Sequence, residues 1–183
     1  MHTHSENSAA RYGIVAQLLH WLVAAMVFVQ LGLGIYAGNL PVSLARLKWL
    51  SWHKALGIIL LALVLLRLAW RAFHSPPALP AFLPRHERLL ALVVHALLYA
   101  MLVLAPLSGW LYASAAGLSV TVRGLRIPNL VERNPGLAAA FHDTHVIFVV
   151  VLASLIVLHV AGALRHALRH DGIMSRMLPW RRT

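Results

Sequence analysis

The stretch Thr144-His-Val-Ile-Phe-Val-Val-Val-Leu-Ala-Ser-Leu-Ile-Val-Leu-His-Val-Ala-Gly-Ala-Leu164 decides the fold. It contains no Asp, Glu, Lys or Arg, and a helix of about 20 apolar residues crosses the hydrocarbon core of a membrane. It also contains His145 and His159, and ionisable side chains inside a bilayer are costly, rare and usually functional. We therefore predict a membrane-spanning helix that carries a functional site.

Three other runs have the same character. Ile14–Tyr36 and Leu89–Tyr112 carry no charge, and the shorter apolar run Ala55–Leu66 is flanked by tryptophans and basic residues, which favour membrane interfaces. Because helices in lipid must satisfy their own backbone groups and pack on one another, we predict an all-α, integral membrane four-helix bundle. It forms a single domain over residues 1–183, with spans at about 14–36, 52–73, 89–112 and 144–167.

Composition excludes several classes of protein. The chain is 60% hydrophobic and 11% charged, whereas soluble domains carry about 25% charged residues. The lipid bilayer is therefore an expected partner, and nucleic acid is not.

Cysteine is absent, which excludes disulfides, iron–sulfur clusters and thiolate-bound haem. We expect no cleavable signal peptide, because the first apolar run is long and follows a polar tail.

The distribution of basic residues predicts the orientation. With four spans both termini lie on one side, and that side holds ten basic residues against six on the other. The ten are Arg11, Arg67, Arg71, Arg85, Arg88, Arg165, Arg169, Arg176, Arg181 and Arg182, and the six are Arg46, Lys48, Lys54, Arg123, Arg126 and Arg133. Cytoplasmic loops carry the excess of Lys and Arg, so we predict both termini in the cytoplasm.

Four histidines pair by depth in these spans. His145 and His159 are 14 residues apart, which places them within about 40° of one helix face and about 21 Å apart along the axis. His53 is level with His145, and His20 is level with His159. This pattern predicts two stacked bis-histidine sites, which suit haem iron engaged in electron transfer. His95 lies near the inner depth, so spacing alone leaves it as an alternative to His20.

The longest predicted connection, Ala113–Phe141, contains three glycines and two prolines. We expect it to form a loop with one short amphipathic helix, packed on the outer end of the bundle.

The chain resembles the bacterial cytochrome b561 family of four-helix, di-haem proteins of the inner membrane. The resemblance covers nearly the whole sequence and rests on the order and spacing of several short elements. These are Leu19-His20-Trp21-Leu22, His53 with Arg67 and Arg71, His95-Ala-Leu-Leu-Tyr99, Ala105-Pro106-Leu-Ser-Gly109, His145, His159, His166 and Met177-Leu178-Pro179.

The resemblance implies two haem b groups with iron ligands on the first, second and fourth helices. His20 and His159 then hold the inner haem, His53 and His145 hold the outer haem, and His95 is not a ligand. The element Phe141-His142-Asp143 also resembles a family motif, which makes His142 an alternative outer ligand. We favour His145, because the 14-residue spacing to His159 falls on it.

The activity that the resemblance implies is superoxide oxidation on the periplasmic side, with ubiquinone reduced near the cytoplasmic side. A basic outer face attracts an anion such as superoxide, and Lys54 and Arg126 are our candidates for that steering. The quinone candidates at the inner end are His166, Arg67, Arg71 and His95. The alternative is a non-catalytic membrane cytochrome b subunit that passes electrons between quinone and a periplasmic redox protein.

Overall fold

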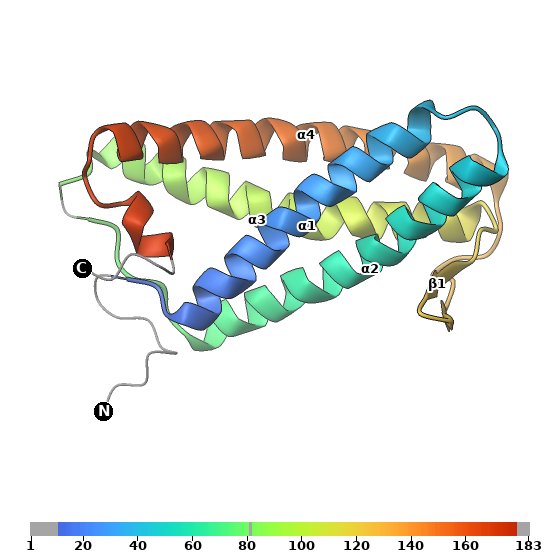
Figure 1. Ribbon diagram of the computed structural model, residues 1–183, viewed down its shortest axis with the longest axis horizontal. Helices are drawn as coiled ribbons and strands as arrows, with labels where there is room; N and C mark the ends of the chain where they lie inside the picture. Colours follow the sequence, from blue (N-terminus) through green and yellow to red (C-terminus); the bar gives the residue numbers. More distant parts are fainter. Residues whose placement is uncertain (1–10, 81, 179–183) are drawn as a thin grey trace.

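Four long helices account for most of the chain in the computed structural model, which describes residues 11–80 and 82–178 (Figure 1). They are α1 (Ile14–Asn39), α2 (Leu44–Phe73), α3 (Arg85–Ala115) and α4 (Pro135–Leu168). A hairpin of β1 (Val120–Val122) and β2 (Leu125–Ile127) lies between α3 and α4, and the 3-10 helix η1 (Met174–Met177) follows α4. The predicted polar tail over residues 1–10, with Arg181 and Arg182, lies outside the described residues.

All four helices are long and apolar enough to cross a membrane, and each predicted span lies inside one of them. The all-α, membrane-spanning prediction is thus confirmed. α4 begins nine residues before its predicted span, because Asn134 caps it by accepting a hydrogen bond from the Leu137 N–H at 3.1 Å. Pro135 fits the first helical position, where its missing N–H costs nothing. The helix therefore extends beyond the apolar run.

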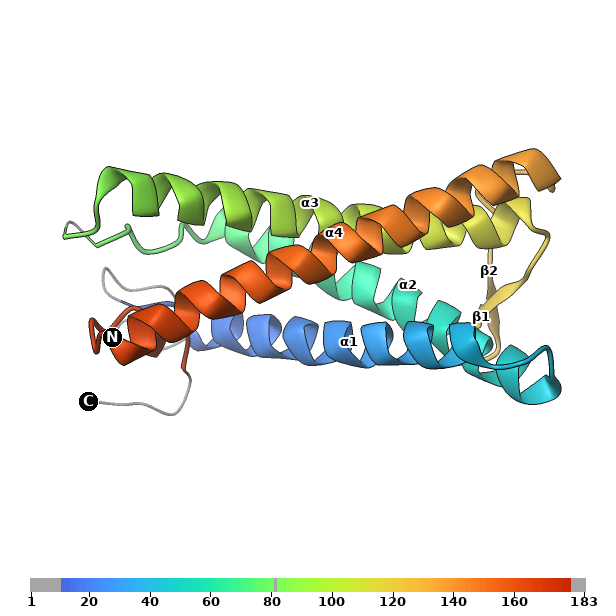
Figure 2. The same ribbon diagram turned by 90° about the horizontal axis from the view of Figure 1, so that it is seen from above.

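The helices form two antiparallel hairpins. α1 packs along α2, α3 packs along α4, and α2 also contacts α3 (Figure 2). Small and branched side chains fill the centre between them: Val23, Val27, Leu60, Val64, Ala105 and Leu152. We call the end of the bundle that holds the start of α1 and η1 the terminal end, and the opposite end, with the β-hairpin, the far end (Figure 1).

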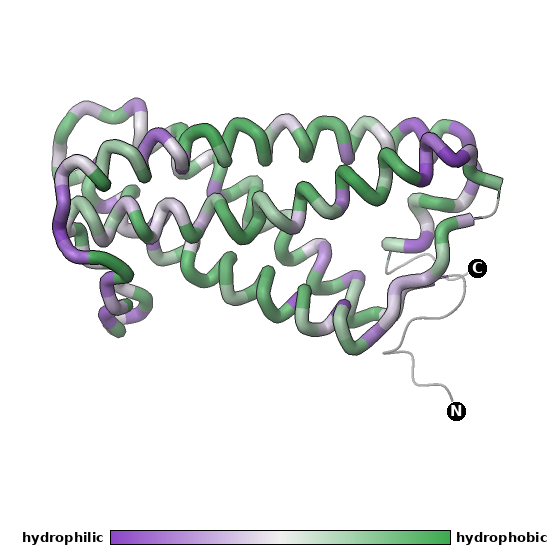
Figure 3. The backbone as a smooth tube through the Cα atoms, turned by 180° about the vertical axis from the view of Figure 1, so that it is seen from behind, coloured by the Kyte–Doolittle hydropathy of each residue, from purple (hydrophilic) through white to green (hydrophobic). Residues whose placement is uncertain are grey.

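Hydrophobic residues predominate along the middle of the bundle (Figure 3). Val157 is 70% exposed and Ile35 is 67% exposed, although both lie within long helices. A water-soluble bundle would turn such residues inward. This surface fits a lipid bilayer.

The predicted short helix in the connection after α3 is wrong, because a two-stranded hairpin occupies that place. Val120 pairs with Ile127 and Val122 with Leu125. Arg123 and Gly124 have φ of 48° and 86°, and positive φ at both central residues suits a tight two-residue hairpin turn. Lys54 of α2 donates a hydrogen bond to the Ser119 carbonyl at 2.8 Å. This hydrogen bond holds the hairpin against α2 at the far end of the bundle.

Candidate functional site

Two histidines from different helical hairpins meet at the far end. The ring centres of His53 on α2 and His145 on α4 are 6.3 Å apart, with the rings inclined by 78°. α4 lies against α3 rather than α2, so these two side chains reach toward each other across the space between the hairpins.

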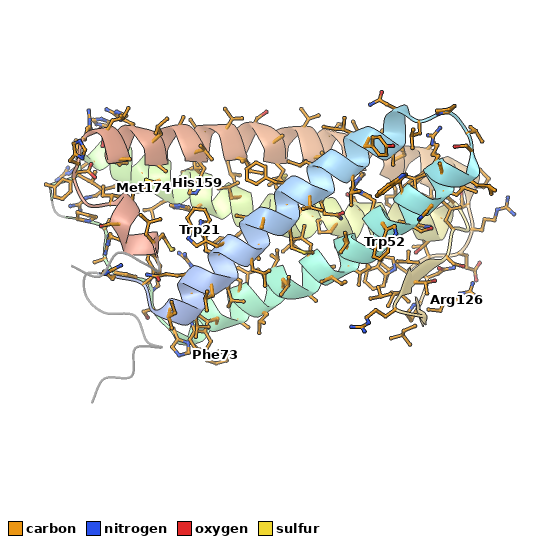
Figure 4. The ribbon with its side chains drawn as sticks, viewed as in Figure 1. Trp21, Trp52, Phe73, Arg126, His159 and Met174 are labelled. Carbon is orange, nitrogen blue, oxygen red and sulfur yellow. The ribbon has the colours of Figure 1, made fainter. Side chains whose placement is uncertain are left out.

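A second pair repeats this arrangement at the terminal end. The ring centres of His20 on α1 and His159 on α4 are also 6.3 Å apart, with the rings inclined by 72°. His159 and the neighbour of His20, Trp21, lie close together on this end in Figure 4. α4 therefore contributes one histidine to each end, and the other hairpin contributes the partner.

The separation within each pair matches two imidazoles on opposite sides of one metal ion. An imidazole nitrogen lies about 2 Å from a metal that it binds, which places the ring centres of two opposed ligands about 6.4 Å apart. His95 and His159, whose ring centres are 5.2 Å apart, are too close for that arrangement. They also belong to the same hairpin. The structure thus brings His20, rather than His95, to the ligand-like separation from His159.

Hydrogen bonding leaves one nitrogen of His145 available to a metal. Its Nδ1 is 2.8 Å from the carbonyl oxygen of Ala105, and a carbonyl only accepts, so Nδ1 carries the proton and Nε2 keeps its lone pair. Metal-binding histidines commonly donate their other N–H in this way. The Ser108 hydroxyl donates to the same carbonyl at 2.7 Å. The Nδ1 of His53 is buried with no hydrogen-bond partner among the described residues.

Glycines make room for both far-end imidazoles. A Cβ added to Gly34 of α1 would lie 3.2 Å from Cε1 of His53, and a Cβ added to Gly109 of α3 would lie 3.0 Å from Cε1 of His145. Each ring therefore rests on the bare backbone of the neighbouring helix in its own hairpin. This support directs each imidazole toward the opposite hairpin. The pair of imidazoles at each end of the bundle fits a haem held by two histidines.

Adding one methyl group tests this support. We expect Gly34→Ala to lower the temperature at which the loaded protein loses its haem absorbance by several degrees, because overpacking costs about 1–3 kcal/mol. The matched control is Gly32→Ala, two residues away on α1, where an added Cβ meets no described atom within 4 Å. The same loss in both variants would show that the contact with His53 has no special role.

Three of the four quinone candidates gather near the terminal-end pair. Arg67 donates to the Tyr99 hydroxyl at 3.1 Å and to the Ala16 carbonyl at 3.1 Å. The guanidinium of Arg71 lies 5.3 Å from the centre of the Tyr99 ring, and His95 contacts His159. A polar cluster of two arginines, a phenol and an imidazole therefore adjoins this pair.

The fourth candidate, His166, contacts a residue that the sequence reasoning missed. Its Nδ1 is 2.6 Å from Oδ2 of Asp171, and both side chains are largely buried. The sequence did contain a signal for Asp171, because acidic residues are scarce: the chain has only five. The same scarcity marks Glu87, which was also missed and which pairs with Arg165 and Arg169 and so joins α3 to the end of α4.

The two steering candidates lie in different surroundings at the far end. The ammonium of Lys54 is half-buried and engaged with the Ser119 carbonyl. Arg126 is exposed on β2, opposite Thr121, and extends outward from the hairpin in Figure 4.

The alternative outer ligand, His142, lies three residues before His145 on α4 and has other contacts. Its ring centre is 5.2 Å from that of Tyr112 on α3, and its Nδ1 is 3.2 Å from Asp143. It lines a cleft of ≈ 400 Å³ together with Tyr112, Arg133 and Asp143. The structure therefore brings His145, and not His142, opposite His53.

Comparison with known proteins shows the family of this chain. The family model described as prokaryotic cytochrome b561 matches residues 11–180. Cytochrome b561 homolog 2 of Escherichia coli (strain K12) is 32% identical over 185 residues, covering 94% of this chain and 93% of that protein. Probable superoxide oxidase CybB of Yersinia pestis is 28% identical, covering 98% and 99%. The resemblance drawn from the sequence is confirmed: the chain belongs to the prokaryotic cytochrome b561 family of membrane-spanning, haem-containing electron-transfer proteins.

Proposed function

We propose that this protein oxidises superoxide at the far end, facing the periplasm, and reduces ubiquinone at the terminal end, facing the cytoplasm. Two histidine pairs with the same 6.3 Å separation, one at each end of α4, carry this proposal. They are the proposed ligands of two haem b groups, His20 with His159 and His53 with His145. A haem held by each of these pairs of imidazoles would supply one-electron transfer.

Electron balance fixes the overall reaction. Each superoxide gives one electron and becomes dioxygen, and ubiquinone takes two electrons and two protons to become ubiquinol. Two superoxide ions are therefore consumed for each ubiquinol formed. The protein's residues attract the anion at one end, hold the quinone head group at the other and supply the protons.

The charge of the far end supports superoxide as the electron donor. The far end carries Arg46, Lys48 and Lys54 on α2 and Arg123, Arg126 and Arg133 between α3 and α4, opposed by Glu132 and Asp143. A positive surface raises the local concentration of an anion and its rate of encounter. We assign steering to Arg126, which is exposed, and to Lys54, which follows His53 in the chain. The name of the Yersinia pestis relative supports the same donor.

The cluster beside His20 and His159 supports quinone reduction at the terminal end. Arg67, Arg71 and His95 supply hydrogen-bond donors for quinone oxygens, and the imidazole of His166 supplies a proton-carrying group at the same end. The cytoplasmic placement of this end rests on its excess of basic residues.

One observation favours a second function, an electron conduit for a periplasmic redox protein. The β-hairpin presents Leu125, 69% exposed, between Arg123 and Arg126 at the far end. Apolar and arginine side chains are typical of protein interfaces. This function would keep the same histidine pairs and use the hairpin as the docking surface.

A spectroscopic experiment tests the proposed function. Purified protein should show a b-type reduced-minus-oxidised spectrum, and superoxide should reduce its haem faster than superoxide dismutates spontaneously. A colourless protein would exclude both functions. A coloured protein that superoxide does not reduce would leave the conduit.

Separate replacement of His142 and His145 tests the choice of the far-end ligand. We expect His145→Ala to lose one haem and His142→Ala to retain both, because only the His145 ring faces His53 at the separation of two opposed ligands. The measurement is the haem-to-protein ratio of each purified variant. Loss of haem only in the His142 variant would reverse the assignment.

A further inference from the structure

Asp171 occupies a sharply defined turn just beyond the end of α4. The residues on either side of it, His170 and Gly172, have φ of 53° and 80°, so the chain reverses direction around Asp171. Its Oδ2 is 2.6 Å from Nδ1 of His166, and its Oδ1 accepts a hydrogen bond from the Ile173 N–H at 3.1 Å. Both oxygens of the carboxylate are therefore engaged, and one of them is on the imidazole.

The segment that carries Asp171 folds back over the terminal-end pair. The indole N–H of Trp21 donates to the Met177 carbonyl at 2.9 Å, and the side-chain amide of Gln17 donates to the Arg176 carbonyl at 3.2 Å. The ring of Trp21 packs edge-on against that of His20, 5.3 Å away. Figure 4 shows Met174 of this segment on the same end as Trp21 and His159. The segment that begins at Asp171 is thus tied to α1 beside His20.

His166 lies between His159 and Asp171. It follows His159 by seven residues, which places it on nearly the same face of α4 and about 10 Å closer to the terminal end. Asp171 lines a cleft of ≈ 490 Å³ with Leu79, Pro80, Ile173 and two arginines, Arg11 and Arg176. The contact between Asp171 and His166 therefore joins this cleft to α4, seven residues beyond His159.

Reduction of ubiquinone at the terminal end requires a route for protons. The two electrons arrive through the protein, but the two protons must come from water on the terminal side. A carboxylate at Nδ1 fixes the tautomer of an imidazole, stabilises its protonated form and leaves the proton on Nε2 to be transferred. The ring then takes a new proton from water.

We propose that Asp171, through its hydrogen bond to Nδ1, positions His166 as the group that gives protons to ubiquinone at the terminal end. This inference rests on the proposed function. Asp171 is a positioning residue, and His166 is the proton donor.

The charges around Asp171 keep it in the form that this role requires. Arg169 at the C-cap of α4, Arg11 before α1 and Arg176 on η1 are charged groups near it. Burial raises the pKa of Asp171, but hydrogen bonds from His166 and the Ile173 N–H, with the charge of Arg169, outweigh burial and hold this pKa below its usual value. The residue therefore stays ionised and acts as a partner for the imidazole.

The test is Asp171→Asn in vesicles that contain the loaded protein and a short-chain ubiquinone. We expect ubiquinol formation to slow about tenfold at neutral pH, and the loss of rate with rising pH to begin at a lower pH. An imidazolium without its carboxylate partner is less stable, which accounts for the sign. His166→Gln should also slow the reaction, and the double variant should add no further loss, because the two residues act as one unit.

Two controls separate this role from a structural one. Glu87→Gln removes another largely buried carboxylate at the same end, one that pairs with Arg165 and Arg169, and we expect its rate and pH profile to match the parent. Asp171→Glu restores the carboxylate and should recover part of the rate. An unchanged pH profile in Asp171→Asn, or an equal loss in Glu87→Gln, would overturn the proposal.

Superoxide-driven haem reduction without quinone keeps the two proposals distinguishable. We expect the Asp171 variants to retain it at the parental rate, since it occurs before proton transfer. If the parent protein itself lacks it, the proposed function fails. If only the variants lose it, the effect lies outside proton transfer and the positioning role is wrong.

Discussion

His20→Ala is expected to remove one of the two haems, whereas His95→Ala retains both. Both residues lie at the depth of His159, but only His20 belongs to the opposite hairpin and has its ring centre 6.3 Å from that of His159. His95 is 5.2 Å from the same ring, which is too close for two opposed ligands of one metal. The measurement is the haem content of each purified variant, taken with its low-spin ferric signals.

The remaining far-end haem is an internal control for folding in this comparison. A His20 variant that keeps the far-end signal has retained the bundle, so the loss is local. Loss of one haem on replacing His95, with both kept on replacing His20, would contradict the assignment and make His95 the ligand.

His53→Ala is expected to lower superoxide-driven ubiquinol formation to the background set by spontaneous dismutation. His53 is the α2 half of the far-end pair, and without it the path from the far end to the terminal end is interrupted. Electron transfer is a sequential process, so loss of one site removes the whole activity rather than a fraction. The measurement is ubiquinol formation by proteoliposomes supplied with superoxide.

A second assay on the His53 variant shows whether its terminal-end site still accepts electrons. Added ubiquinol should still reduce the remaining terminal-end haem of the His53 variant, because His20, His159 and the Arg67–Tyr99 contact are unaltered. Full superoxide-driven activity in this variant would mean that electrons enter elsewhere, and the far-end site would lose its proposed role.

Much of the fold could be predicted because membranes impose simple rules on sequence. Long charge-free runs located three of the helices, and a shorter run flanked by tryptophans and basic residues located α2. Charge says nothing about where a helix ends outside the lipid, so α4 extends to Pro135 beyond its predicted start. The β-hairpin was missed although its signal was present. Val120–Ile127 alternates apolar and polar residues around Arg123-Gly124, a pattern typical of two short strands and a tight turn.

The candidate site was only partly predictable, because depth is readable from sequence and helix pairing is not. The 14-residue spacing identified His145 and His159 on one face of α4. Spacing left His95 as an alternative to His20. The resemblance implied His20, and the packing of α3 with α4 in one hairpin gives that choice a geometric reason. The contact between Asp171 and His166 depends on a chain reversal at two left-handed residues, and spacing along a helix carries no information about such a turn.

The yield of ubiquinol per superoxide consumed by proteoliposomes of the purified protein measures the proposed reaction most directly. We expect one ubiquinol for every two superoxide ions that escape spontaneous dismutation, as the electron balance requires. Ubiquinol formation no greater than in protein-free vesicles, with both haems bound, would contradict it.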